Sequence, residues 1–419
     1  MSDVTVTTLN RGSGVIVALA GMAALAVPMG IGRFALTPIL PMMQVDAGLS
    51  VTAGGWLASA NYAGTLGGAV CAALVRMPAV AAVRGGMLAI GLTTCAMAVT
   101  RNLPAWIVLR GLAGFATAWV LVFASAWSLA RLAPLRRPVL NSAVFAGYGV
   151  GIAGAGLVCL VLMRKHASSA EAWAALGMLA LVVTSLIWPV LGGPGGEPGS
   201  EAPSRWDFDS ACLVVCYGAF GFGYIIPATF LPVMARWVVN DPAVFGWSWP
   251  TFGIAAAAST FVATIIPWSV DNRRLWSVGH VILAAGVVTP VVLPGIWAIM
   301  ASALVVGSMF TVITMAGFQE ARVVRGAAAR GLIGALASAF AIGQIVALLI
   351  VGYALGTGGG LTLALLTAGG LLVVSAGVLW RRPAGSAHEY ALVRQLKPLD
   401  MRPEQPRRPA RSTRPKQGS

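Results

Sequence analysis

Two stretches of sequence, GIGRFALTPILPMM at residues 30–43 and GFGYIIPATFLPVM at residues 221–234, repeat one pattern at an offset of 191 residues. Glycine, leucine, proline and methionine recur at the same places in both. Two tryptophan pairs elsewhere keep the same offset, namely Trp56 with Trp247 and Trp106 with Trp297. One offset that holds at three separated places indicates an internal duplication, so the chain consists of two related halves.

The composition of the chain is that of a membrane protein. Of its 419 residues, 58% are hydrophobic and 10% are charged, and its mean hydropathy is +0.83. Soluble domains carry about 25% charged residues. The apolar residues form runs of about the 20 residues that a helix needs to cross roughly 30 Å of hydrocarbon. We therefore predict an all-α integral membrane protein with twelve membrane-spanning helices. The predicted spans are 14–41, 53–75, 84–100, 104–130, 139–163, 171–191, 208–234, 244–268, 275–293, 295–318, 331–355 and 360–380.

Two polar stretches divide this pattern into domains. Residues 192–207 are rich in glycine, proline and acidic residues, which is typical of a flexible linker. Residues 381–419 are rich in proline and arginine, which is typical of disorder. The predicted organisation is an N-terminal six-helix bundle (1–191), a cytoplasmic linker (192–207), a C-terminal six-helix bundle (208–380) and a basic cytoplasmic tail (381–419). Six helices per half give both halves the same orientation in the membrane.

The distribution of basic residues predicts the orientation of the chain. With the N-terminus in the cytoplasm, the predicted cytoplasmic segments before the tail hold 12 arginines and the outer loops hold four arginine or lysine residues. The tail adds ten more on the inside. Basic residues accumulate on the cytoplasmic side of membranes, so we expect both termini in the cytoplasm of a bacterium, with the protein in the inner membrane. The net charge of +15 therefore indicates topology and contact with membrane lipids rather than nucleic-acid binding.

Two arginines, Arg33 and Arg110, lie inside predicted spans, whereas none of the 13 carboxylates lies near the middle of one. Ionisable residues inside a bilayer are costly and indicate function. Both arginines lie roughly 10 Å inside the outer face at about 1.5 Å per residue, and Asn61 and Tyr62 lie at a similar depth. A guanidinium in low dielectric attracts carboxylate or phosphate. This polar layer predicts an organic-anion site with Arg33 as the main contact.

The internal repeat extends this candidate site into the second half. It places Tyr224 at the position of Arg33, so a hydroxyl and a guanidinium could share one substrate. Thr37, Thr229 and Gln344 are weaker candidates for the same cavity. Three alternatives stay open at this stage. Arg110 could have a structural or coupling role, backbone carbonyls could satisfy Arg33, and Asn61 could hydrogen-bond between helices.

Glycines and prolines gather in the first helix of each half. Closely spaced glycines let helices pack tightly, and prolines interrupt the backbone hydrogen bonds of a helix. We expect these residues to act in gating or as hinges, with permanent kinks as the alternative. They are Gly30, Gly32, Pro38 and Pro41 in the first half, and Gly221, Gly223, Pro227 and Pro232 in the second.

Several motifs resemble those of the major facilitator superfamily. Residues 110–114, Arg-Gly-Leu-Ala-Gly, resemble its R-x-x-x-G motif, and residues 271–274, Asp-Asn-Arg-Arg, resemble its loop motif after the eighth helix. The matching loop after the second helix, residues 75–78, lacks the acidic residue. The stretch at 30–43 followed by GGWLASANYAGTLGG at 54–68 is similar to the YbfB/YjiJ-type branch. The resemblance implies two six-helix bundles, the major facilitator fold, and transport by alternating access, without naming a substrate.

These observations favour a secondary active transporter that moves a small organic solute, with an organic anion as the favoured class. The alternative within transport is a drug or metabolite efflux antiporter. A membrane enzyme or receptor is less favoured because the sequence contains no HExxH, Walker or GxSxG motif and no metal-ligand spacing. We therefore expect no catalytic residue, cofactor or metal. A proton is one candidate coupling ion, while uniport and anion exchange stay open.

The predicted orientation can be tested with a reporter enzyme fused after Ser419. Because the predicted cytoplasmic segments carry far more basic residues than the predicted outer loops, the reporter should show the activity of a cytoplasmic location. Activity of a periplasmic reporter at the same position would reverse the topology.

Overall fold

The computed structural model describes residues 11–75, 77–135, 137–192, 207–265, 271–325, 329–356 and 360–381. All regular elements in these ranges are helices, which confirms the predicted all-α class. Ten of them are long and apolar enough to cross a membrane by length and composition. Residues 193–206 of the predicted linker and 382–419 of the predicted tail lie outside the described residues.

Helices of the first half follow the order of the predicted spans. Three consecutive segments, α1, η1 and α2, together occupy the place of the first span. The elements are α1 (Arg11–Ala26), η1 (Val27–Arg33), α2 (Leu36–Asp46), α3 (Val51–Leu74), α4 (Ala79–Val99), α5 (Leu103–Leu132), η2 (Ala133–Leu135), α6 (Pro138–Arg164) and α7 (Ser169–Ile187).

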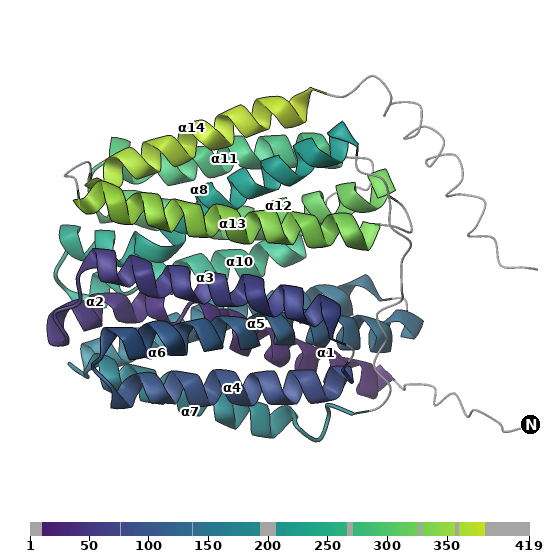
Figure 1. Ribbon diagram of the computed structural model, residues 1–419, viewed down its shortest axis with the longest axis horizontal. Helices are drawn as coiled ribbons and strands as arrows, with labels where there is room; N and C mark the ends of the chain where they lie inside the picture. Colours follow the sequence, from purple (N-terminus) through teal and green to yellow (C-terminus); the bar gives the residue numbers. More distant parts are fainter. Residues whose placement is uncertain are drawn as a thin grey trace, which may run out of the picture. The chain divides into compact units, whose positions relative to one another are not determined.

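The second half repeats this order. It consists of α8 (Phe208–Val238), α9 (Pro242–Phe245), α10 (Ser248–Ile265), α11 (Asn272–Val292), α12 (Ile296–Arg325), α13 (Ala329–Gly356) and α14 (Gly360–Trp380). Figure 1 shows the long helices lying side by side along one direction, with α8 and α11–α14 on one side and α3–α7 on the other. Both halves belong to a single compact unit that ends at Trp380.

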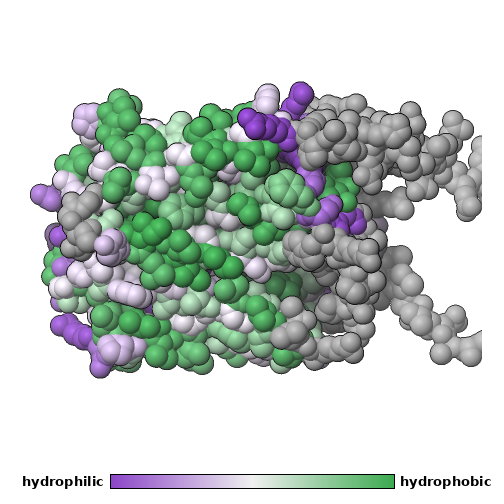
Figure 2. All heavy atoms as spheres, turned by 45° about the horizontal axis from the view of Figure 1, so that its top comes forward, coloured by the Kyte–Doolittle hydropathy of each residue, from purple (hydrophilic) through white to green (hydrophobic). Residues whose placement is uncertain are grey.

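The surface between the two ends of the helices is apolar. The face in Figure 2 is mostly hydrophobic, and the hydrophilic residues gather toward its ends. Large apolar side chains on the surface include Leu92 (60% exposed), Val108 (60%), Leu186 (72%) and Trp297 (83%). An apolar surface of this extent on a folded chain is the surface that a bilayer covers.

The first helix differs from its predicted span of 14–41. It continues through α2 to Asp46 because Pro38 lies in the first turn of α2 and Pro41 is accommodated inside it. The irregularity lies earlier, in η1, which is a π-helical segment with Pro28 in its first turn. Phe34 N donates to Met29 O at 3.2 Å, the wider spacing of a π-turn. The prediction that this helix ends at residue 41 is therefore wrong.

Two other predicted boundaries are also corrected. The span 244–268 does not start as one helix, because a short helix, α9, ends at Phe245 and α10 begins at Ser248. The span 295–318 ends too early, because α12 continues to Arg325. The residues of α12 after 318 include Glu320, which is buried and forms an ion pair with Arg273. The break predicted between the ninth and tenth spans is confirmed at Gly295, whose φ of +98° favours glycine.

Glycines bring α3 and α5 into backbone contact in the first half. A methyl group at Gly64 would lie 2.0 Å from the carbonyl oxygen of Gly111, and one at Gly68 would lie 2.4 Å from that of Phe115. At Gly114 the nearest atom would be the carbonyl oxygen of Asn61, at 1.9 Å. Small residues permit this approach between helices in a membrane, and the approach brings Asn61 next to the chain of α5.

The two halves meet where α2 packs on α8, α6 on α9 and α10, and α3 on α13. The α6–α10 contact is close, since a methyl group at Gly149 would lie 2.2 Å from the backbone nitrogen of Ala257. Between α2 and α8, the Thr37 hydroxyl donates to the Ala228 carbonyl at 3.2 Å, over a separation of 191 residues. Residue 228 is the repeat equivalent of residue 37, so this hydrogen bond joins equivalent positions of the two halves.

The α3–α5 contact can be tested with two neighbouring glycines. Gly68→Ala should lower the melting temperature in detergent, because overpacking against a backbone costs about 1–3 kcal/mol. Gly67→Ala is the matched control, since Gly67 is exposed and has no atom within 4 Å of the added methyl group. At position 67 alanine should leave the free energy of unfolding unchanged or raise it by up to about 1 kcal/mol. Equal melting temperatures for both variants would contradict this account of the packing.

Candidate functional site

Arg33 is the last residue of η1, the irregular segment of the first helix that precedes α2. The carbonyl oxygens of Gly32 and Arg33 accept hydrogen bonds from side chains of other helices. Asn61 Nδ2 donates to Gly32 O at 3.0 Å and to Arg110 O at 2.9 Å, and Arg110 Nη2 donates to Arg33 O at 2.7 Å. Backbone groups away from water need such partners. Asn61 and Arg110 therefore fix the segment that carries Arg33.

The side chain of Arg33 contacts residues from both halves. Its guanidinium carbon lies 4.8 Å from the ring centre of Tyr62, 5.5 Å from that of Phe34 and 5.9 Å from that of Phe340. Its Nη2 donates to Oε1 of Gln344 on α13. Arg33 is only half-buried, and its Nε has no hydrogen-bond partner among the residues described. The guanidinium thus lies among aromatic rings and has an N–H donor, at Nε, without a partner among the described residues.

Tyr224, the repeat equivalent of Arg33, lies in a cluster of aromatic rings. Its ring stacks on Phe310 with 4.8 Å between centres and meets Phe34 edge-on at 6.5 Å. Tyr224 is fully buried, and its hydroxyl has no hydrogen-bond partner in the described part of the chain. Phe34 links this ring cluster to Arg33, so the apolar and the charged parts of the candidate site are adjacent.

Arg110 is buried and makes no ion pair with a carboxylate in the ranges described. It is 1% exposed, bonds the backbone of Arg33 and lies 5.6 Å from the ring centre of Trp173. Its position on α5 suits a residue that orients Arg33. Thr37 is likewise engaged, since its hydroxyl bonds Ala228 across the contact between the halves. Two of the predicted candidates, Tyr62 and Gln344, therefore contact the Arg33 side chain. Three others donate hydrogen bonds to backbone carbonyl groups instead, namely Asn61, Arg110 and Thr37.

The predicted hinge glycines are points of close packing. Methyl groups at Gly30 and Gly32 would lie 2.1 Å from the carbonyl oxygen of Gly151 and 2.3 Å from Thr117 Oγ1. In the second half, a methyl group added at Gly221 would lie 2.2 Å from the carbonyl oxygen of Phe340, and one added at Gly223 would lie 2.5 Å from the Leu372 side chain. The prolines Pro227 and Pro232 lie inside α8, which continues to Val238. A hinge role for all of these positions stays a proposal.

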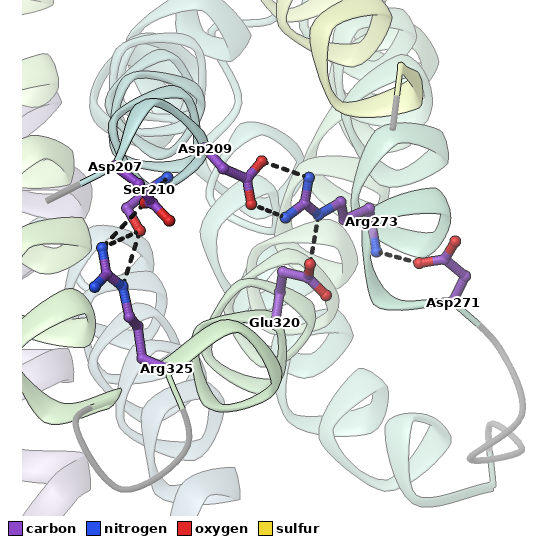
Figure 3. A network of polar contacts seen from close by, with 7 residues as sticks. All are labelled: Asp207, Asp209, Ser210, Asp271, Arg273, Glu320 and Arg325. Atoms are coloured by element: carbon purple, nitrogen blue, oxygen red, sulfur yellow. Dashed lines mark hydrogen bonds and ion pairs between the residues drawn. The ribbon is translucent and has the colours of Figure 1, made fainter. Parts of the chain in front are cut away.

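A charged cluster that the sequence analysis did not identify lies among α8, α11 and α12. Arg273 Nη1 donates to Asp209 Oδ1 at 2.7 Å, and the same arginine pairs through Nη2 with Asp209 and through Nε with Glu320. Figure 3 shows the two carboxylates converging on this guanidinium. Glu320 is 0% exposed. The signal was present in the Asp271–Arg274 motif, but pairing with Asp209 and Glu320 depends on three separate helices.

Beside this cluster, Arg325 binds the residues at the N-terminus of α8. Its Nη2 lies 3.0 Å from Asp207 Oδ1 and donates to Ser210 Oγ at 2.8 Å, as Figure 3 shows. Asp207 is the N-cap of α8 and accepts from Ser210 N at 2.9 Å. Hydrogen bonding from Ser210 lowers the pKa of Asp207 from its ordinary value. In the described residues no group of three or more His, Cys, Asp or Glu side chains could hold a metal ion.

Comparisons with known proteins agree with this architecture. The family model described as "Uncharacterised MFS-type transporter YbfB" matches residues 25–380. A comparison with curated proteins gave no match. Among solved structures, a mutant of the nucleoside transporter NupG is similar, with a TM-score of 0.66 and 15% sequence identity. The alignment covers 87% of this chain and 99% of that one. At this identity the likeness establishes the fold.

The charged cluster can be tested by removing its arginine. Arg273→Ala should destabilise the protein by about 3–5 kcal/mol, because it leaves buried Glu320 without its cation. Arg274→Ala is the neighbouring control, since the Arg274 side chain is 65% exposed and lies 3.8 Å from Asp271. Unfolding in detergent measures both. Equal stability of the two variants would show that the cluster contributes nothing to the fold.

Proposed function

Because the chain belongs to the YbfB-type family of major facilitator transporters, we propose that it is a secondary active transporter of small organic anions. Membrane transport of a small molecule follows from the family, and the apolar helices make it an integral membrane protein. The anionic class of the substrate, the bacterial inner membrane and the cytoplasmic termini are the parts that we propose.

The observation that carries the proposal is the set of partners of Arg33. Within the described ranges its guanidinium contacts an amide oxygen and three aromatic rings, all of them neutral. A cation at this depth is stabilised most by a negative partner. A substrate with a carboxylate or phosphate group supplies that partner, and the guanidinium edge offers it two parallel donors.

The neighbouring groups fit the rest of such a substrate. Arg110 adds a second positive charge close to Arg33, which raises the local concentration of anions. Phe34, Tyr224 and Phe310 form a buried aromatic cluster beside the guanidinium, which suits a substrate with an apolar or planar body. The buried Tyr224 hydroxyl is available as a further donor or acceptor.

The position of Arg33 also connects binding to transport. Arg33 precedes α2, which packs on α8 of the other half, and its side chain reaches α13. A substrate bound at this point contacts both halves at once, as alternating access requires. We propose that movement of the halves about this contact exposes the site to either side. A proton can accompany the anion or move in exchange for it.

Arg33 variants test the function directly. Arg33→Ala should abolish uptake of the anion into proteoliposomes, and Arg33→Lys should raise its KM by about tenfold or more, because lysine lacks the bidentate fork. Candidate substrates for the assay come from a thermal-shift screen of purified protein against paired anionic and neutral metabolites. Arg101→Ala, at an exposed position, is the control for insertion and general charge. Normal uptake by folded Arg33→Ala protein would refute an anion site.

A further inference from the structure

We propose that Gln344 occupies the place of the substrate's anionic group when the transporter is empty. Its amide oxygen accepts the hydrogen bond from Arg33 that the anion would accept, so the anion must displace it to bind. This inference rests on the proposed function, since it names the group that the anion replaces. It also makes Gln344 the residue that links substrate binding to the contact between the halves.

Aromatic rings surround the Arg33 guanidinium. Its central carbon lies over the rings of Tyr62 and Phe34 at 4.8 and 5.5 Å and over that of Phe340 at 5.9 Å. The Nε and Nη2 donors share one edge of the planar group. Gln344 Oε1 accepts from Nη2, while Nε has no partner among the described residues. One amide oxygen thus fills half of an edge that a carboxylate, with two oxygens, fills completely.

Gln344 is also held weakly enough to be displaced. It is fully buried, yet its Nε2 has no hydrogen-bond partner in the part of the chain that the structure describes. The amide is therefore fixed only through its oxygen. A carboxylate replaces this single charge-to-neutral hydrogen bond with an ion pair, in which two parallel N–H donors of the guanidinium bond its two oxygens.

The same hydrogen bond joins the two halves of the protein. Arg33 belongs to the first half and Gln344 to α13 of the second, 311 residues away. The other polar contacts between the halves near this point use backbone oxygens as acceptors: Thr37 with Ala228 and Arg236 with Pro41. An anion at Arg33 leaves those two contacts in place and removes the contact with Gln344. Binding therefore loosens α13 from the first helix.

A cross-link between α3 and α13 reports on this contact without any ligand. Cysteines replace Thr52 and Gly352, where a methyl group at Gly352 would lie 3.9 Å from Thr52 Cγ2. The five native cysteines are changed to alanine in the full-length chain in proteoliposomes. Gln344→Glu should speed disulfide formation by about fivefold and Gln344→Ala should slow it by about as much, the factor that one hydrogen bond represents. Asn102→Asp, the corresponding change from an amide to a carboxylate at an exposed position, should leave the rate unchanged.

Two added probes distinguish a stand-in for the anion from a simple contact between helices. Benzoate should slow the cross-link in the Gln344 protein, and benzamide, a neutral molecule of the same shape, should not. In the Gln344→Glu protein benzoate should have no effect, because it must then displace a carboxylate. The proposal is overturned if benzoate affects both proteins equally or affects neither. It is also overturned if the cross-linking rate is the same in the Gln344 protein and in both Gln344 variants. Loss of anion uptake in Arg33→Ala together with any of these results leaves the proposed function intact.

Discussion

The arrangement of this protein depends on how an irregular helix is satisfied where no water is present. A membrane-spanning helix normally bonds its own backbone groups, and any departure from regular geometry must find other donors inside the protein. The π-helical segment that ends at Arg33 is such a departure. Asn61 and Arg110 supply the donors, and the glycine contacts of α3 with α5 bring them within reach. The position of the Arg33 side chain follows from these constraints.

The two halves share one fold but handle charge differently. In the second half, carboxylates from α8 and α12 surround Arg273 (Figure 3). In the first half, Arg84 Nη2 donates to the carbonyl oxygens of Trp188 at 2.8 Å and Leu191 at 2.6 Å, just beyond the end of α7. Cations near a helix C-terminus are favourable because of the helix dipole. A duplicated backbone therefore kept its packing while its polar contacts diverged, which is why the repeat predicts helices better than it predicts sites.

This divergence explains the chemistry of the central region. Arg33 and Tyr224 are repeat equivalents, yet one is a half-buried cation and the other a fully buried ring. A site between related halves can thus be asymmetric, with a charged wall from the first half and an aromatic wall from the second. Asp46, the acidic residue at the end of α2, does not join this site, because it accepts hydrogen bonds from Ser169 at the start of α7. The charge in the proposed site is therefore positive.

The sequence by itself determined the class of fold, the order of the helices and the identity of the two intramembrane arginines. These depend on local properties, namely hydrophobic runs of membrane length, punctuation such as Pro294-Gly295, and the repeat of 191 residues. The tertiary structure decided what the arginines do, because hydrogen bonds between helices join residues that no sequence spacing relates. In the folded protein Arg110 donates a hydrogen bond to the backbone of Arg33, and the Arg33 side chain donates one to Gln344. Arg273 donates to Asp209 and Glu320. The tertiary structure also moved the irregularity of the first helix from its later prolines to the segment that ends at Arg33, since only packing against α4, α5 and α6 decides which departure from regular geometry is satisfied.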